Sequence, residues 1–286
     1  MIDVTNYFMP GGVTCGVMAL NKKGMLMVYQ DILYNKEDRI AAITLNRPDN
    51  RNAFTPEMTD SLSRAIDDAA RDNDVRVLTV TGSGNSFCSG ADVKAMAKRA
   101  GRSGGKTVAS RNMPMGLMFH RFPKPVIAAV NGIAAGGGLD LALACDIRIA
   151  SDRARFAEVF IRRGLIPAMG GTYFLPRLVG IDRACLLVWT GDMVDAKEAE
   201  RIGLVTMVVP HNDLAGATRE LAEKLVKGPP LAIQKAKQVI YEGLKLSLEE
   251  TIEYVSPLLK ELQATEDHQE GARAFVEKRE PFFKGK

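Results

Sequence analysis

The chain has 286 residues, of which 46% are hydrophobic and 25% charged, and its net charge is +4. These values are ordinary for a globular protein, and the length allows one large domain or two small ones with a sizeable core. Because the positive residues are scattered, we expect no nucleic acid partner, and because no apolar run reaches roughly 18 residues we expect no membrane span.

The cysteines and histidines match no metal site and no disulfide framework, so no metal is predicted. We expect free thiols in a reducing cytoplasm, and histidines that lie at the surface or are hydrogen-bonded in the core. The residues are Cys15, Cys88, Cys145, Cys185, His120, His211 and His268.

The N-terminal segment has neither the basic and apolar regions of a signal peptide nor a clear periodicity. We therefore expect residues 1–28 to form a loosely attached extension. A strand is predicted over residues 39–48, where Pro48 stops it. The next segment, residues 55–72, predicts a helix with Thr55 as its N-cap and Pro56 as its first residue.

Strands and helices alternate through the middle of the chain, which favours an α/β fold. A helix is expected to begin after Gly90, a surface loop rich in Gly, Ser and basic residues to cover 99–110, and another helix to begin at the glycines near residue 137. Further strands are predicted over residues 75–82, 125–132, 146–151 and 204–210.

After about residue 211 the pattern becomes helical throughout. Amphipathic helices are predicted over residues 212–228, 229–245, 247–264 and 266–280. We therefore divide the chain into the extension 1–28, an α/β core at 29–210 and a helical region at 211–286, which we expect to support oligomerisation.

Three consecutive glycines, Gly136 to Gly138, precede Asp140 inside an apolar run. The sequence around them has neither G-x-G-x-x-G nor a P-loop, so a phosphate cradle is weakly supported, and close helix–strand packing is the structural alternative. A second turn of this kind is expected at residues 86–92, where a strand ends and a helix begins after Gly90. Two such turns can aim backbone N–H groups at one carbonyl oxygen, and a nearby carboxylate can move a proton.

Several segments resemble the crotonase, or enoyl-CoA hydratase/isomerase, superfamily, and the resemblance runs from about Tyr29 to Lys286. They are "FCSGADVKAM", "KPVIAAVNGIAAGGGLDLALACDIRIAS", "GLIPAMGGTYFLPRLVG" and "TGDMVDAKEAERIGLV", with matching N- and C-terminal segments. The resemblance implies the crotonase-like (ClpP/crotonase) fold, an α/β spiral of ββα repeats with a C-terminal helical trimerisation region. It also implies an acyl-CoA thioester substrate, a homotrimer or hexamer, and no cofactor other than the coenzyme A of the substrate.

Carried over position by position, the resemblance implies that the N–H groups of Ala91 and Gly137 form an oxyanion hole. Arg51 and Lys94 would meet the phosphates of coenzyme A, unless they are only solvated surface charges. The residues implied to bind coenzyme A or the acyl group are Arg51, Ala53, Phe54, Ser89, Gly90, Asp92, Val93, Lys94, Gly136, Phe160 and Pro167.

The acid positions depart from the family pattern. The first glutamate of the hydratases matches Asp140, but the second falls at Phe160 and the acid of some isomerases falls at Ala168. Glu158 is the nearest spare acid, and it either enters the site or lies at the surface beside Arg162 or Arg155. We expect Asp140 to be the principal proton-transfer group.

The resemblance favours an enoyl-CoA hydratase. A single acid also suits an enoyl- or dienoyl-CoA isomerase, so this alternative stays open. An acyl-CoA hydrolase and a catalytically weak acyl-CoA-binding subunit are further alternatives. Turnover of crotonyl-CoA against a 3-enoyl-CoA separates the first two.

Overall fold

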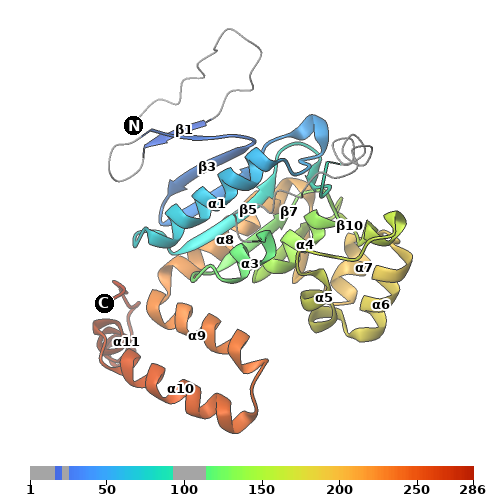
Figure 1. Cartoon of the computed structure of the whole chain (residues 1–286). Coiled ribbons are helices and arrows are strands. Elements are labelled where there is room, and N and C mark those ends of the chain that lie inside the picture. The colour runs from blue at the N-terminus through green and yellow to red at the C-terminus, as the bar shows by residue number, and fades with distance from the viewer. Residues whose placement is uncertain (1–16, 21–25, 93–113) are drawn as a thin grey trace, which may run out of the picture.

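The computed structural model describes residues 17–20, 26–92 and 114–286 (Figure 1). Of the helix expected after Gly90, only Ala91 and Asp92 are described and neither is helical, and the rest of it lies outside these ranges, as does the loop expected at 99–110. Val93 and Lys94, both expected to bind substrate, lie outside them as well.

A six-stranded sheet in the order β12-β9-β7-β5-β4-β3 forms the centre of the molecule. Its parallel strands are those predicted by the sequence: β4 (Ile40–Leu45), β5 (Val77–Gly82), β7 (Val126–Val130), β9 (Ile147–Ser151) and β12 (Met207–Val209). The edge strand β3 (Ile32–Glu37) was not predicted, and it pairs antiparallel with β4. Asp38 and Arg39 join the two strands with φ of 49° and 66°, as a tight hairpin requires.

A second, four-stranded sheet has the order β11-β10-β8-β6. Its strands are β6 (Ser86–Cys88), β8 (Ile133–Ala135), β10 (Arg155–Ala157) and β11 (Val194–Asp195). Since each has at most three residues, no periodicity in the sequence marks it. Along the chain, β5, β7 and β9 are each followed by one of these short strands, and helix α4 (Gly137–Ala144) completes the ββα repeat of β7 and β8.

Helices cover both faces of the central sheet (Figure 1). Helix α1 (Pro56–Arg71) begins as predicted, because the Thr55 hydroxyl accepts a hydrogen bond from the Met58 N–H at 2.9 Å. The remaining helices of the core are α3 (Met115–His120), α5 (Gly171–Val179), α6 (Ile181–Thr190) and α7 (Ala196–Arg201), with 3₁₀ turns at η1 (Pro48–Asn50), η2 (Val159–Arg163) and η3 (His211–Asp213).

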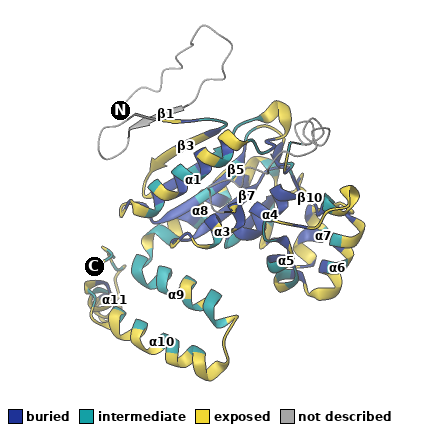
Figure 2. Cartoon of the chain, viewed as in Figure 1, coloured by how far each residue is buried: buried dark blue, intermediate teal, exposed yellow. Residues whose placement is uncertain are grey.

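The C-terminal region is helical, as predicted. Helix α8 (Leu214–Lys227) packs on the central sheet, whereas α9 (Pro230–Gly243), α10 (Leu248–Gln263) and α11 (Glu266–Glu277) extend away from it (Figure 2). These three helices expose much of their surface. In the described ranges, no helix is both long enough and apolar enough to cross a membrane.

Part of the expected N-terminal extension forms a hairpin. Strands β1 (Val17–Leu20) and β2 (Leu26–Tyr29) pair antiparallel and contact β3. Tyr29 at the end of β2 is buried in the main core. The strands β1 and β2, which are the described part of the extension, therefore lie against the edge of the central sheet.

Candidate active site

The two glycine turns lie against each other. Strands β6 and β8 are parallel neighbours, so the turns that follow them leave the same edge of the second sheet. A Cβ atom added to Gly90 would lie 2.9 Å from the Gly137 backbone nitrogen, and one added to Gly138 would lie 2.0 Å from the Cys88 carbonyl oxygen. The glycines are therefore required for this close backbone approach.

Helix α4 begins where the two turns meet. Gly137 is the first residue of α4, so its N–H has no acceptor within the helix and lies at the positive end of the helix dipole. Ala91 forms a parallel bridge with Phe54, where the Phe54 N–H donates to the Gly90 carbonyl at 2.8 Å. The expected donors Ala91 and Gly137 thus belong to adjoining turns.

Asp140 lies in the first turn of α4 and is fully buried. Its Oδ2 accepts a hydrogen bond from the Met169 N–H at 3.0 Å. A Cβ atom added to Gly171 would lie 2.1 Å from Asp140 Oδ1 and 2.8 Å from Glu158 Oε1. The side chains of Asp140 and Glu158 therefore meet at the start of α5.

Glu158 is fully buried, so the alternative of a surface glutamate is wrong. It follows β10 directly and precedes η2, where the chain changes from an extended to a helical path. Arg162 pairs with Asp192 at 3.2 Å, and Arg155 donates to the Ala154 carbonyl. Neither arginine takes the place of Asp140 as the partner of Glu158.

Burial raises the pKa of both carboxyl groups. The Met169 N–H, which donates to Asp140 Oδ2, lowers the pKa of Asp140, whereas the charge of Asp140 raises the pKa of Glu158 further. Among the described residues, no neighbouring N–H or O–H donates to Asp140 Oδ1 or to either oxygen of Glu158. The two groups are therefore best satisfied by sharing one proton, with Glu158 as the weaker acid.

Apolar side chains surround the start of α4. A Cβ atom on Gly137 would lie 3.0 Å from Met169 Sδ and 3.2 Å from the Phe54 ring, and one on Gly136 would lie 3.6 Å from the Phe160 ring. Phe160 is half-buried. The structure thus brings Phe54, Gly136 and Phe160 together, and it adds Met169, which sequence reasoning did not identify.

The other expected binding residues occupy the same region. Arg51 is exposed, and its carbonyl accepts a hydrogen bond from the Ser89 N–H at 3.0 Å. The carboxylate of Asp92 lies 3.7 Å from the guanidinium of Arg47. Pro167 also lies beside the two carboxyl groups, because a Cβ atom added to Gly171 would be 3.0 Å from the Pro167 side chain. Ala53 is buried and its carbonyl accepts from Arg47 at 2.7 Å.

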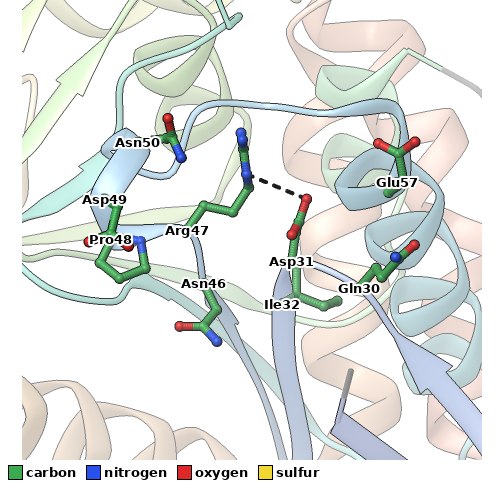
Figure 3. A pocket seen from close by; sticks show the side chains of 9 residues that line it. All are labelled: Gln30, Asp31, Ile32, Asn46, Arg47, Pro48, Asp49, Asn50 and Glu57. Atoms are coloured by element: carbon green, nitrogen blue, oxygen red, sulfur yellow. Dashed lines mark ion pairs between the residues drawn. The ribbon is translucent and has the colours of Figure 1, made fainter. Parts of the chain in front are cut away.

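A cavity of about 610 Å³ is lined by residues 30–32, residues 46–50 and Glu57 (Figure 3). Arg47 forms one side of it and pairs with Asp31 across 3.5 Å. Since Arg47 also reaches Ala53 and Asp92, its guanidinium fixes the 51–54 segment against the turn after Gly90. No motif in the sequence pointed to this residue.

The spiral of ββα repeats, the second sheet and the C-terminal helices define a protein of the crotonase fold. A model of the "Enoyl-CoA hydratase/isomerase" family matches residues 35–286. The chain therefore belongs to the enoyl-CoA hydratase/isomerase family of enzymes.

Individual relatives agree with this assignment. The chain is 37% identical to a short-chain-enoyl-CoA hydratase of Clostridium acetobutylicum over 88% of this chain and 97% of that protein. It is 36% identical to a 2,3-dehydroadipyl-CoA hydratase of Escherichia coli over 90% and 99%. A crystal structure of an enoyl-CoA hydratase from Bacillus anthracis superposes with a TM-score of 0.85 at 36% identity, and the match covers 90% of this chain and 100% of that one.

Proposed function

We propose that this enzyme adds water to a 2-enoyl-CoA thioester and releases a 3-hydroxyacyl-CoA. The observation that carries this proposal is the buried pair of Asp140 and Glu158 beside the two converging backbone turns. Relatives named as hydratases support it. Coenzyme A enters only as part of the substrate, and the chemistry needs no metal or redox cofactor.

In this proposal the thioester oxygen lies between the N–H groups of Ala91 and Gly137. The charge that develops on this oxygen as water attacks is stabilised by the two donors and by the positive end of α4. Polarisation of the thioester carbonyl makes the β-carbon of the enoyl group electrophilic, and the enolate that forms when water adds is basic at its α-carbon. Apolar neighbours such as Phe54 and Met169 lower the local dielectric, which strengthens both hydrogen bonds.

The two carboxyl groups supply the protons. Ionised Asp140 accepts a proton from water as the water oxygen bonds to the β-carbon. Protonated Glu158 gives its proton to the α-carbon of the enolate. A proton then passes from Asp140 to Glu158, which restores the starting state and balances the reaction.

The isomerase alternative has one observation in its favour. Phe160 places an aromatic ring where the hydratases of the family have their second acid, so the site is more apolar there. An isomerase would use Asp140 to take a proton from one carbon and return it to another.

Steady-state kinetics distinguish the reactions. We expect crotonyl-CoA to lose its enoyl absorbance as water adds, with little conversion of a 3-enoyl-CoA to its 2-enoyl isomer. Conversion of the 3-enoyl-CoA without hydration of crotonyl-CoA would replace hydratase by isomerase. Release of free coenzyme A would indicate a hydrolase, and binding without turnover a binding subunit.

We also propose a homotrimer or a hexamer, supported by large apolar side chains exposed on α9, α10 and the segment between them. They are Ile240, Leu244, Leu248, Ile252 and Leu259. Light scattering should give three or six times the 31.1 kDa chain mass, and a monomer would contradict the proposal.

A cytoplasmic location is supported by the unpaired thiols of Cys88, Cys145 and Cys185.

A further inference from the structure

Two backbone segments that lie apart in the sequence are held together beside the proposed oxyanion hole. The Ser89 N–H donates to the Arg51 carbonyl at 3.0 Å, and the Phe54 N–H donates to the Gly90 carbonyl at 2.8 Å. Only two residues separate Arg51 from Phe54. The path of the chain between them therefore decides where Gly90 and Ala91 lie.

Asn52 occupies the middle of this path. It is fully buried and has a φ of 55°, in the left-handed region that few residues other than glycine adopt. Its Oδ1 accepts from the Arg47 N–H at 2.8 Å, and its Nδ2 donates to the carbonyls of Ser83 at 2.9 Å and Ser86 at 2.7 Å. These bonds fix the orientation of the amide and attach it to both ends of the turn between β5 and β6.

Cys88 extends the contact towards the oxyanion turn. Its Sγ donates to the Asn52 carbonyl at 3.0 Å and accepts from the Gly90 N–H at 3.4 Å. Burial raises the pKa of this thiol to about 12, so it keeps the proton that it donates. Asn52, Cys88 and Gly90 thus form a continuous hydrogen-bonded chain that ends one residue before Ala91.

We infer that Asn52 is a positioning residue that, through Cys88, sets the place of the Ala91 N–H relative to the Gly137 N–H. This inference rests on the proposed oxyanion hole. Displacement of a catalytic donor by about 1 Å costs on the order of 10²-fold in rate. A small change in the Asn52 contacts is therefore expected to lower turnover more than it lowers substrate affinity.

The principal test is Asn52→Asp, which keeps the size of the side chain but places an oxygen against the Ser83 and Ser86 carbonyls. We expect kcat to fall about 10- to 100-fold with KM within about 3-fold of the parent value. The spectroscopic readout is the enolate absorbance of bound acetoacetyl-CoA, a 3-ketoacyl thioester. The enolate fraction depends on the oxyanion donors and needs no turnover, so it should fall in the variant.

Asn131→Asp is the matched control. Asn131 is also buried, and its Nδ2 donates to the carbonyls of Gly84 and Ser86, but it makes no hydrogen bond to the 51–54 segment. This variant is expected to lose stability as Asn52→Asp does, yet to keep the parent enolate fraction. Equal losses of enolate in the two variants would reduce the role of Asn52 to a structural one.

Cys88→Ala decides the question if Asn52→Asp fails to fold. It removes the link to Gly90 while leaving the Asn52 amide in place, and we expect a fall of about 3- to 10-fold in kcat with a lower enolate fraction. A folded Asn52→Asp, or failing that Cys88→Ala, with the parent kcat and enolate fraction would overturn the inference. If the parent enzyme itself forms no enolate with acetoacetyl-CoA, it is the proposed oxyanion hole that fails.

Discussion

The carboxyl groups of Asp140 and Glu158 meet at the N-terminus of α5, although they come from different ββα repeats. Asp140 is held there by the Met169 N–H, and Glu158 by the change of path between β10 and η2. When two buried carboxyl groups are in contact, burial and the repulsion between two negative charges disfavour the ionisation of both. The pair therefore keeps one proton, which the two groups share. The pair therefore offers one base and one acid near neutral pH.

Asp140→Asn is expected to lower kcat for hydration by about 10²-fold or more, since it keeps the shape and removes the basic oxygen. The measurement is steady-state turnover of crotonyl-CoA. Asp182→Asn, at an exposed acid in the first turn of α6, is the control and should keep full activity. Full activity of Asp140→Asn would show that the base lies elsewhere.

Glu158→Gln is expected to cause a comparable loss with crotonyl-CoA, because the amide cannot supply the α-carbon proton. The sequence alone favoured Asp140 as the only acid, and the buried contact between the two residues changes that expectation. Near-normal hydration by a folded Glu158→Gln would return the mechanism to a single acid. Isomerisation of a 3-enoyl-CoA by Glu158→Gln at the parent rate would also indicate that Asp140 acts as the single acid.

The sequence predicted the longer elements and one of the two acids. Helix α1 has a Thr-Pro start and an apolar stripe, and β4, β5, β7 and β9 are apolar enough to be found without a structure. The short strands of the second sheet carry no period, so the residues suggested that the turns at Gly90 and Gly137 converge, but only the family resemblance assigned the N–H groups of Ala91 and Gly137. Glu158 was undecided because its direction depends on where β10 ends, and sequence patterns fix such boundaries poorly.

The stability of the folded chain should depend on pH through Asp140. Burial raises the pKa of Asp140 in the folded state above its unfolded value of about 4. The contribution of this carboxyl to the free energy of unfolding is therefore fully present below about pH 4, and it is lost as the pH rises towards neutrality. Asp140→Asn should therefore raise the Tm at neutral pH by about 2–4 °C, which corresponds to roughly 1 kcal/mol, and should raise it less near pH 4. Thermal unfolding across this range measures the difference. A Tm gain that does not depend on pH would show that Asp140 carries no buried charge.

A substitution at Gly171 tests the geometry of the acid pair without replacing either acid. A methyl group there would lie 2.1 Å from Asp140 Oδ1 and 2.8 Å from Glu158 Oε1, so Gly171→Ala must push the two carboxyls apart. We expect at least a 10-fold loss of kcat, because the base and the acid no longer face the same substrate carbons.

Gly216→Ala is the matched control for this change. Gly216 lies inside α8 with no atom within 4 Å of an added Cβ, so alanine should add about 0.5–1 kcal/mol of helix stability and leave kcat unchanged. Measured side by side, the two variants separate a local clash at the acids from a general effect of replacing glycine. If Gly171→Ala matched Gly216→Ala in kcat, Asp140 and Glu158 would not act as a pair on the substrate.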